Sequence, residues 1–345
     1  MRRKFNAPTS YDVASHAGVS QAVVSRAFQA DAPIAAATRV RVLAAAQALG
    51  YQPNAVARSL ITKRSGLVAI LISQDTQRET SEVLFSLCLA LQRHEFQPLL
   101  FTVAQEADAE QAMTRALAHG IDAIISCLEL TQAALARAWK RPCPVVMFNR
   151  EAPADLASSV ATDNRGASRL LASRLYAAGH RRFALVAGPP VAPVARMREG
   201  GFTDRLAELG VSNLQYVAGD YHYESGHAAG LQLLQSPDPA QRPEVIYCVN
   251  DAMALGVLDA ARFALMLQVP QDVSIVGFDN IPAGQRPAYR LTTVSQPFDA
   301  LAERVANEVR NRLADQARCT QVQLPAELVE RASALLFPRV ASPGG

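Results

Sequence analysis

The sequence predicts an α/β protein in which a small N-terminal helix-turn-helix domain precedes a larger body of doubly wound parallel sheets. Two observations predict this fold class. Residues 1–64 are basic and carry apolar residues at helical spacing, whereas from Leu67 onward short apolar runs alternate with amphipathic segments. The chain has 345 residues, 50% of them hydrophobic, which is enough for more than one domain with a large core.

Charge is distributed unevenly along the chain. The formal net charge is +3. Residues 1–64 hold nine Lys or Arg and two Asp, which makes this part +7 and the remainder −4. A basic end on a mildly acidic body is expected where a protein binds a polyanion. A solvated basic tail is the alternative, and the apolar residues at helical spacing argue against it.

The first helix is predicted by its end signals. Thr9 followed three residues later by Asp12 has the form of a capping box, so a helix should begin near Ser10. Gly18 should end it. The apolar face of this helix is expected to comprise Val13, Ala14 and Ala17.

Two more helices complete the predicted N-terminal domain. Ser20 is expected as the N-cap of the second, and Gly50 as the residue that ends a third over residues 38–50. Two short helices joined by a glycine turn form a helix-turn-helix, whose second helix lies in the DNA major groove. The expected buried positions are Val23, Val24 and Ala27 in the second helix, and Val40, Leu43, Ala46 and Leu49 in the third.

The body is predicted as alternating buried strands and crossover helices. This alternation is typical of doubly wound α/β folds, in which ligands bind at the carboxyl ends of the strands. The predicted strands are 67–73, 97–103, 123–128, 145–149, 183–188, 215–219, 245–250 and 273–279. The predicted helices are 80–94, 107–119, 166–179, 198–210, 224–235 and 252–265.

Several segments closely resemble the lactose/galactose repressor (LacI/GalR) family of bacterial transcription regulators. The resemblance covers about residues 9 to 335. It rests on DVASHAGVSQAVVSRAF (12–28), TRVRVLAAAQALGYQPNAVARSL (38–60), ATDNRGASRL (161–170), NDAMALG (250–256), VPQDVSIVGFDN (269–280) and LTTVSQP (291–297).

The resemblance implies roles for residues of the DNA-binding part. The base-reading positions would be Gln21, Ala22 and Arg26. Their chemistry suits the role, because Gln bonds adenine, Arg grips guanine and Ala touches a thymine methyl group. The residues facing phosphates would be Tyr11, Ser20, Ser25 and Asn54, with Ser20 also capping its helix.

The resemblance also implies a hinge helix that folds in the minor groove of specific DNA. Leu60 would insert between the central base pairs, with Ala57 and Arg58 beside it in the groove. A passive linker is the alternative. The third helix departs from the family, because PIAAATR (33–39) lacks the usual Ser-Pro cap, so looser local order is expected there.

The family architecture divides the chain into a DNA-binding domain (1–53), a hinge helix and linker (54–65), and a two-lobed core (66–340) like the periplasmic sugar-binding proteins. By this resemblance lobe 1 comprises about residues 66–162 and 295–323, and lobe 2 about 163–290 and 324–340. The chain would cross between the lobes near Thr162, Pro287 to Gln296, and Leu324.

The effector would bind between the lobes. Residues carried over from the family as effector contacts are Arg198, Asn250 and Asp279, with Tyr221 as an aromatic platform and Asn149 and Ser73 from lobe 1. The usual Asn-Pro-Phe-Phe segment after the first strand is replaced here by QDTQRET (74–80), so the effector class stays open. A carbohydrate-like effector that releases DNA is favoured, and a nucleobase or other metabolite acting as co-repressor is the alternative.

Other functions find little support in the sequence. It has no GxxxxGK[ST], GxSxG or HExxH motif, and its five cysteines show no CxxC pair, so we expect no enzyme, cofactor, metal site or disulfide framework. No secretory signal or transmembrane run is present, so a cytoplasmic protein is expected rather than a sugar-binding transport protein. The expected assembly is a homodimer, and a helical tetramerisation tail is not expected after Phe337.

Overall fold

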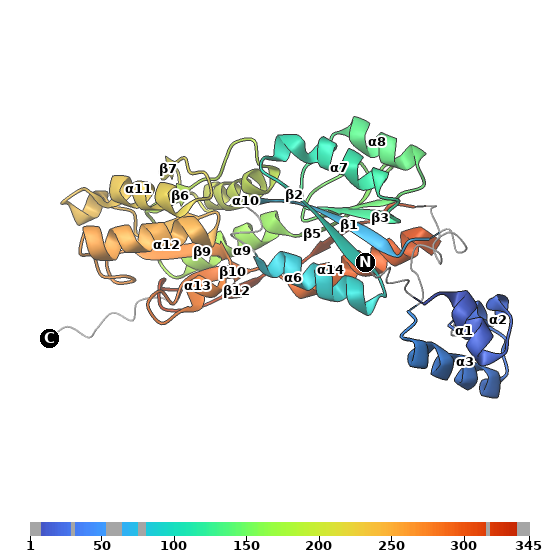
Figure 1. Ribbon diagram of the computed structural model, residues 1–345. Helices are drawn as coiled ribbons and strands as arrows, with labels where there is room; N and C mark the ends of the chain where they lie inside the picture. The colour runs from blue at the N-terminus through green and yellow to red at the C-terminus, as the bar shows by residue number, and fades with distance from the viewer. Residues whose placement is uncertain (1–7, 29–31, 53–63, 75–80, 315–317, 337–345) are drawn as a thin grey trace, which may run out of the picture. The chain divides into compact units, whose positions relative to one another are not determined.

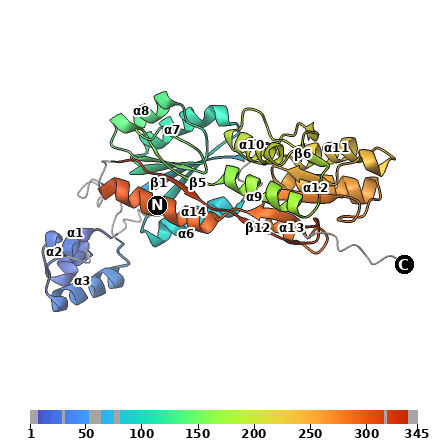
Figure 2. The same cartoon turned by 180° about the vertical axis from the view of Figure 1, so that it is seen from behind.

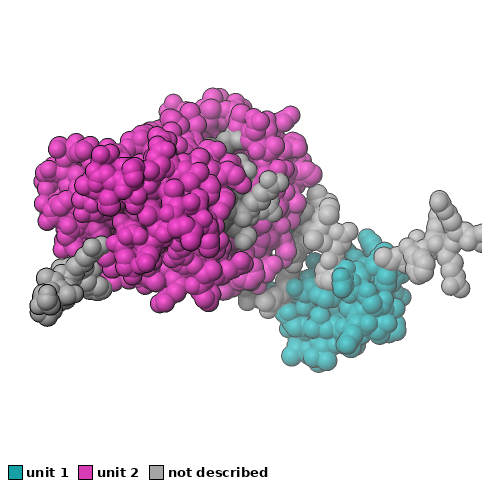
Figure 3. Space-filling view, turned by 90° about the vertical axis from the view of Figure 1, so that its left-hand side faces the viewer, with its two compact units in different colours: residues 1–66 teal, residues 67–345 magenta. Residues whose placement is uncertain are grey.

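The computed structural model describes residues 8–28, 32–52, 64–74, 81–314 and 318–336. These residues form two compact units that divide between Gly66 and Leu67 (Figure 3). The first is helical with a small core of its own, and the second contains two α/β halves, each built on one sheet with hydrophobic cores between that sheet and its helices. The predicted fold class is confirmed.

The first unit contains α1 (Ser10–Ala17), α2 (Gln21–Ala27) and α3 (Ala36–Leu49). The predicted capping box is present: the Asp12 amide donates to Thr9 Oγ1 at 3.4 Å, and the Thr9 amide donates to Asp12 Oδ2 at 2.8 Å. Gly18 ends α1 with a φ of 62°, a conformation that glycine adopts without strain. Both ends of this helix are therefore fixed by local interactions.

The buried face of α3 agrees with the predicted one at Ala46 and Leu49 and differs from it at Val40 and Leu43. The residues of α3 in the core are Val42, Ala45 and Ala46, whereas Val40 and Leu43 are 68% and 41% exposed. Both faces of α3 carry apolar residues, so only its packing against α1 and α2 selects one. Its N-cap makes no side-chain hydrogen bond, but Arg39 donates to the carbonyls of Ala27 and Ala32, both at 3.0 Å, and so ties the start of α3 to the end of α2.

The second unit is built on two six-stranded sheets at its opposite ends (Figure 1). Sheet A has the order β11-β5-β4-β3-β1-β2 and sheet B the order β12-β10-β9-β8-β6-β7. All described strand pairs are parallel except β10 with β12. The strands of sheet A are β1 (Leu67–Ser73), β2 (Gln97–Val103), β3 (Ala123–Ser126), β4 (Val145–Phe148), β5 (Ser158–Thr162) and β11 (Gln321–Leu324). Those of sheet B are β6 (Phe183–Val186), β7 (Leu214–Val217), β8 (Val245–Cys248), β9 (Ser274–Asp279), β10 (Thr292–Ser295) and β12 (Glu327–Val329).

Helices cover both faces of each sheet (Figures 1 and 2). On sheet A, one core lies under α6 and α14 and another under α7 and α8. On sheet B, α9 packs against α10 and α11 against α12. Their bounds are α6 (Ser81–Arg93), α7 (Ala109–Ala118), α8 (Gln132–Lys140), α9 (Asn164–Ala177), α10 (Pro193–Glu208), α11 (Tyr223–Leu234), α12 (Asp251–Asp259), α13 (Pro282–Gln285) and α14 (Phe298–Ala314). Short turns lie at Glu106–Asp108, Pro239–Gln241 and Ala260–Ala264, the last a π-helical turn continuing α12.

The eight predicted strands and six predicted helices all exist, with small changes at their ends. Helices α8, α13 and α14 and the four strands β5, β10, β11 and β12 were not predicted from the sequence. These strands are short, and β5, β10 and β11 are rich in Ser, Thr or Gln, so they lack the long apolar runs that identify a buried strand. They occupy the edge of each sheet nearest the chain crossings, where β5 leads into α9, β10 into α14 and β11 into β12.

The helices α11 and α12 approach closely through two glycines. A Cβ at Gly226 would overlap the backbone of Met253, and one at Gly256 would overlap the carbonyl oxygen of Tyr223. This contact brings the start of α11, and with it the loop before it, beside the start of α12. Among the described helices, none is long and apolar enough to cross a membrane.

Candidate effector cavity and DNA-reading surface

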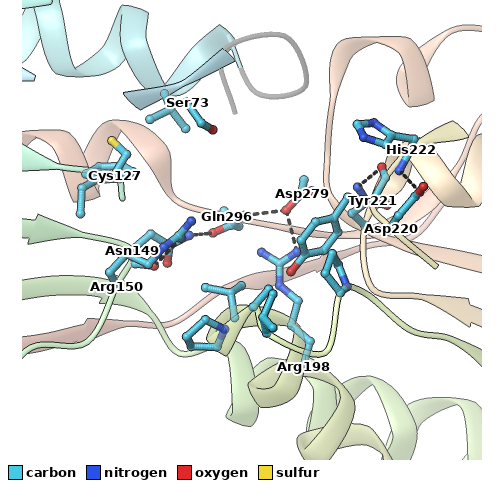
Figure 4. Close-up of a pocket in the computed structure, with 18 of the residues that line it drawn as sticks. Ser73, Cys127, Asn149, Arg150, Arg198, Asp220, Tyr221, His222, Asp279 and Gln296 are labelled. Carbon is cyan, nitrogen blue, oxygen red and sulfur yellow. Dashed lines mark hydrogen bonds and ion pairs between the residues drawn. The ribbon is translucent and has the colours of Figure 1, made fainter. Parts of the chain in front are cut away.

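A cavity of about 410 Å³ lies between the two sheets of the second unit, at the carboxyl ends of their strands (Figure 4). The strand order reverses between β1 and β3 in sheet A and between β6 and β8 in sheet B. Ser73 ends β1 and Asn250 follows β8, so both lie at these reversal points, which are the usual place for a ligand in an open α/β fold. All six residues carried over as effector contacts line this cavity: Ser73, Asn149, Arg198, Tyr221, Asn250 and Asp279.

Arg198 is held in one orientation at the base of the cavity. It lies on α10 and is 3% exposed. Its Nε donates to Asn164 Oδ1 at 2.9 Å, its Nη1 donates to the Val249 carbonyl at 2.7 Å, and its guanidinium lies 3.8 Å from the centre of the Phe278 ring. Nη1 also lies 3.1 Å from Asp279 Oδ1. Nη2 has no partner among the described residues, so it is available to a ligand.

Asp279 is the counter-ion of Arg198 and the last residue of β9. Its φ of 121° is unusual for a residue with a side chain, and its carboxylate is 10% exposed. Burial raises the pKa of Asp279 above its ordinary value, while the Arg198 guanidinium and the Gln296 amide act in the opposite direction. The Arg198 and Gln296 contacts both go to Oδ1, and Oδ2 has no hydrogen-bond partner among the described residues.

Gln296 connects the two lobes and was not predicted as a site residue. Its Nε2 donates to Asp279 Oδ1 at 2.6 Å. Its Oε1 accepts from Asn149 Nδ2 and from Thr162 Oγ1, each at 2.8 Å. A continuous polar chain therefore runs from Asn149 in lobe 1 to Arg198 in lobe 2 (Figure 4). The signal available in the sequence was its place at the end of the LTTVSQP segment, where the chain crosses between lobes.

Tyr221 forms one wall and adopts a strained backbone conformation. Its φ is 74°, a genuine outlier for a bulky residue. Its ring packs over Gly188, where a Cβ would lie 2.9 Å from the ring edge. Asn250 caps α12 by accepting from the Met253 amide at 3.0 Å, and its Nδ2 donates to the Tyr221 carbonyl at 2.8 Å. Asn250 thus acts on the cavity by positioning Tyr221.

Further residues that line the cavity were not singled out from the sequence. The polar ones are Gln105, Cys127, Arg150, Asp220, His222 and Gln296. The apolar ones include Val83, Phe148, Phe298 and the strip from Pro189 to Val194 before and at the start of α10. Among the described residues, no group of three His, Cys, Asp or Glu side chains is arranged to hold a metal ion.

A buried carboxyl group lies directly behind the cavity. Asp251 is fully buried, and its oxygens accept from Thr293 Oγ1 at 2.6 Å and from the Ile281 amide at 2.9 Å. Burial, followed by the charge of Asp279, raises the pKa of Asp251 to about 7. The carboxyl group therefore titrates near neutral pH.

The expected DNA-reading residues lie on the surface of the first unit. Gln21, Ala22 and Arg26 are exposed on α2, with Arg26 Nε donating to the Ala22 carbonyl at 3.4 Å. Tyr11 is 71% exposed and Ser25 is half-buried. Ser20 is the N-cap of α2 as predicted, but its side chain makes no capping hydrogen bond. The other expected DNA contacts, Asn54, Ala57, Arg58 and Leu60, lie outside the described residues.

Each of the two units matches a known protein family, and relatives of this chain contain both. Residues 9–54 match the model of bacterial regulatory proteins of the lacI family, and residues 172–334 match a periplasmic binding protein-like domain. The HTH-type transcriptional repressor CytR of Escherichia coli K12 is 32% identical over 300 residues, which cover 86% of this chain and 87% of that protein. The HTH-type transcriptional repressor PurR of Photorhabdus laumondii is 31% identical over 340 residues, covering 96% and 98%.

Solved structures agree with these relatives. A lac repressor dimer bound to operator and the anti-inducer ONPF superposes with a TM-score of 0.83 at 26% identity, covering 95% of this chain and 99% of that one. The transcriptional regulator CelR in complex with cellobiose superposes with a TM-score of 0.69 at 28% identity, covering 94% and 99%. The DNA-binding domain, the two-lobed core and the relatives that share both show that this chain belongs to the LacI family of bacterial transcriptional regulators.

Proposed function

We propose that this ligand-responsive repressor binds a pseudo-palindromic operator as a homodimer and is released by a small carbohydrate-like effector in the cavity between its lobes. The observation that carries the proposal is the buried pair of Arg198 and Asp279, which presents one donor, Nη2, and one acceptor, Oδ2, without partners in the described chain. Two neighbouring hydroxyl groups match this pair, because each hydroxyl both donates and accepts. The ring of Tyr221 offers an apolar face of the kind that covers one side of a sugar.

A solved neighbour supports the choice of a carbohydrate for this proposal. CelR, which matches over 94% of this chain, was solved with cellobiose. A pure transport role would leave the first unit without a purpose, since α1 and α2 match a DNA-binding domain. The alternative effector is a nucleobase that acts as co-repressor, and the tests below distinguish it from a carbohydrate.

The DNA half of the proposal rests on exposed side chains at the start of α2. Gln21 offers the amide that pairs with adenine, Arg26 the guanidinium that pairs with guanine, and Ala22 a methyl group for thymine. Tyr11, Ser20 and Ser25, together with Asn54, would hold phosphates and set the register. We further propose that Leu60, with Ala57 and Arg58, enters the minor groove at the operator centre.

The polar chain through Gln296 gives effector binding a route to lobe 1. A ligand that engages Asp279 and Arg198 acts on one end of this chain, and Asn149 is at the other. Closure of the lobes around the ligand would change the lobe 1 surface of the dimer and, with it, the hinge segments. The coupling is reciprocal, so an effector that weakens operator binding must itself bind the operator complex more weakly by the same factor.

The effector half is tested by a thermal-shift screen of sugars, disaccharides, sugar acids, nucleosides and purine bases. A ligand that binds the native state raises the unfolding temperature by mass action. We expect a carbohydrate to do so in the wild type and in Arg174→Ala, a change at an arginine that is 53% exposed on α9, but not in Arg198→Ala. The same compound should release the operator. A response confined to nucleobases, with tighter operator binding, would establish the co-repressor function instead.

The DNA half is tested by substitutions in the first unit and the hinge. Exchanging Gln21, Ala22 and Arg26 should change the preferred half-site sequence in a binding selection, and a uniform loss of affinity would make them phosphate contacts. Leu60→Ala should lose operator affinity while keeping weak, salt-sensitive binding to random DNA. Unchanged operator affinity in Leu60→Ala would contradict the hinge proposal.

A further inference from the structure

We infer that the effector is an uncharged polyhydroxy compound, and that Asp279 is the residue that keeps phosphorylated and carboxylated analogues out of the cavity. The inference rests on the proposed function of the cavity as the effector site. It goes further because it separates neutral sugars from sugar phosphates and sugar acids, which share the same hydroxyl groups.

In the described part of the chain, the two cations that line the cavity are already paired with carboxylates. Arg198 Nη1 lies 3.1 Å from Asp279 Oδ1, and Arg150 Nε lies 3.3 Å from Glu129 Oε1. Among the described lining residues the remaining charged side chain is Asp220, another carboxylate. The four charged lining residues of the described chain therefore sum to zero, and Glu129 behind Arg150 adds a negative charge. A site for a phosphate or carboxylate normally has an excess of positive charge.

Some backbone donors beside the cavity are also occupied, although Ala192, the N-cap of α10, makes no side-chain hydrogen bond. The amide of Gly188, in the loop that precedes α10, donates to Glu199 Oε1 at 2.9 Å. The helix α10 begins with Pro193, which has no N–H group, and the Met253 amide at the start of α12 donates to Asn250. Two further helices begin beside the cavity, and each has an acidic residue in its first turn, Glu82 in α6 and Asp299 in α14. These two carboxylates compensate the N-termini of α6 and α14.

What the described residues leave open to a ligand is a mixed set. Asp279 Oδ2 can only accept, Arg198 Nη2 can only donate, and the Tyr221 hydroxyl can do both. Hydroxyl groups satisfy all three. A carboxylate has only acceptors and a phosphate at neutral pH has mostly acceptor oxygens, and either would place its negative charge beside Asp279 Oδ2.

The test measures binding of inorganic phosphate to the full-length protein by calorimetry at constant ionic strength, without DNA. We expect no phosphate binding to the wild type, and binding at least about tenfold tighter to Asp279→Asn, which leaves the Arg198 charge without its carboxylate. Asp155→Asn is the matched control, because it makes the same change of charge at an exposed residue outside the cavity, and it should behave as the wild type. Should Asp279→Asn not fold, Glu129→Gln is the second variant. It removes the carboxylate that pairs with Arg150, and we expect the same gain in affinity for phosphate.

The same protein is then titrated with D-glucose 6-phosphate and D-gluconate. Binding of phosphate or of either compound to the wild type that is lost in Arg198→Ala would overturn the inference. An Asp279→Asn protein that folds but gains no affinity for phosphate would overturn the role given to Asp279. A different result would contradict the proposed function, namely a neutral compound that binds the cavity without changing the affinity for the operator.

Discussion

Replacing Gln296 by glutamate tests whether the polar chain between the lobes depends on one donated hydrogen bond. The Glu side chain has the same shape, so one oxygen can still accept from Asn149 and Thr162. Its other oxygen would replace Nε2, which lies 2.6 Å from Asp279 Oδ1. Gln296→Glu therefore keeps two contacts of the wild type and turns the third into a contact between two carboxylates.

The magnitude follows from this distance and from the cost of adding a proton. Two unit charges 2.6 Å apart repel by roughly 6 kcal/mol at an effective dielectric constant of 20. A proton shared by the pair removes the repulsion. Protonating a carboxyl group of ordinary pKa costs about 5 kcal/mol at pH 8 and about 1 kcal/mol at pH 5. The loss of stability should therefore approach about 5 kcal/mol at pH 8 and shrink to about 1 kcal/mol at pH 5.

The sign of the pH dependence follows from linkage. The shared proton raises the pKa of the carboxyl pair in the folded state above its unfolded value. The variant thus has its full relative stability at low pH and loses it as the pH rises through the folded pKa. Gln296→Met is the control, because it removes all three hydrogen bonds without adding charge and should cost about 3 kcal/mol at every pH.

The assay is urea unfolding at pH 5, 6, 7 and 8, with each variant compared with the wild type at the same pH. The single tryptophan, Trp139 on α8, reports on lobe 1 through its fluorescence. A Gln296→Glu protein as stable as the wild type at pH 8, or one whose loss is as independent of pH as that of Gln296→Met, would refute the assigned contact.

Three more substitutions test other parts of the structure. Asp251, with a pKa raised to about 7, binds its proton more tightly in the folded state, so its contribution to the free energy of unfolding is present at low pH and falls by up to about 4 kcal/mol as the pH rises from 4 through 7. Asp251→Asn should remove this pH dependence from the stability measured by urea unfolding. A variant whose stability changes with pH as that of the wild type does would contradict the assignment. Gly256→Ala should cost more than about 2 kcal/mol in thermal unfolding because its methyl group meets the Tyr223 backbone, whereas a neutral change would mean that α11 and α12 separate easily. Thr9→Ala should cost about 1 kcal/mol, measured by hydrogen exchange of the α1 amides, and Ser20→Ala, which removes no capping bond, should cost less; equal losses would show that the capping box contributes nothing.

The sequence by itself determined the features that depend on neighbouring residues. The capping box of Thr9 and Asp12 and the turn at Gly18 are local, and both were predicted at the positions where they occur. The strands β1 and β2 are continuous apolar runs, and both have the predicted bounds. The family motifs also placed all six expected effector contacts, from Ser73 to Asp279, around one cavity.

Tertiary structure alone decided the features that depend on distant residues. Both faces of α3 are apolar, so packing against α1 and α2 was needed to bury Val42 in place of Val40. Gln296 stands 147 residues from Asn149, 134 from Thr162 and 17 from Asp279, and no periodicity relates such separations. The partners of the buried Gln296 amide are set by the chain crossings that bring its neighbours together, because most buried polar groups are hydrogen-bonded to whatever groups the fold places beside them.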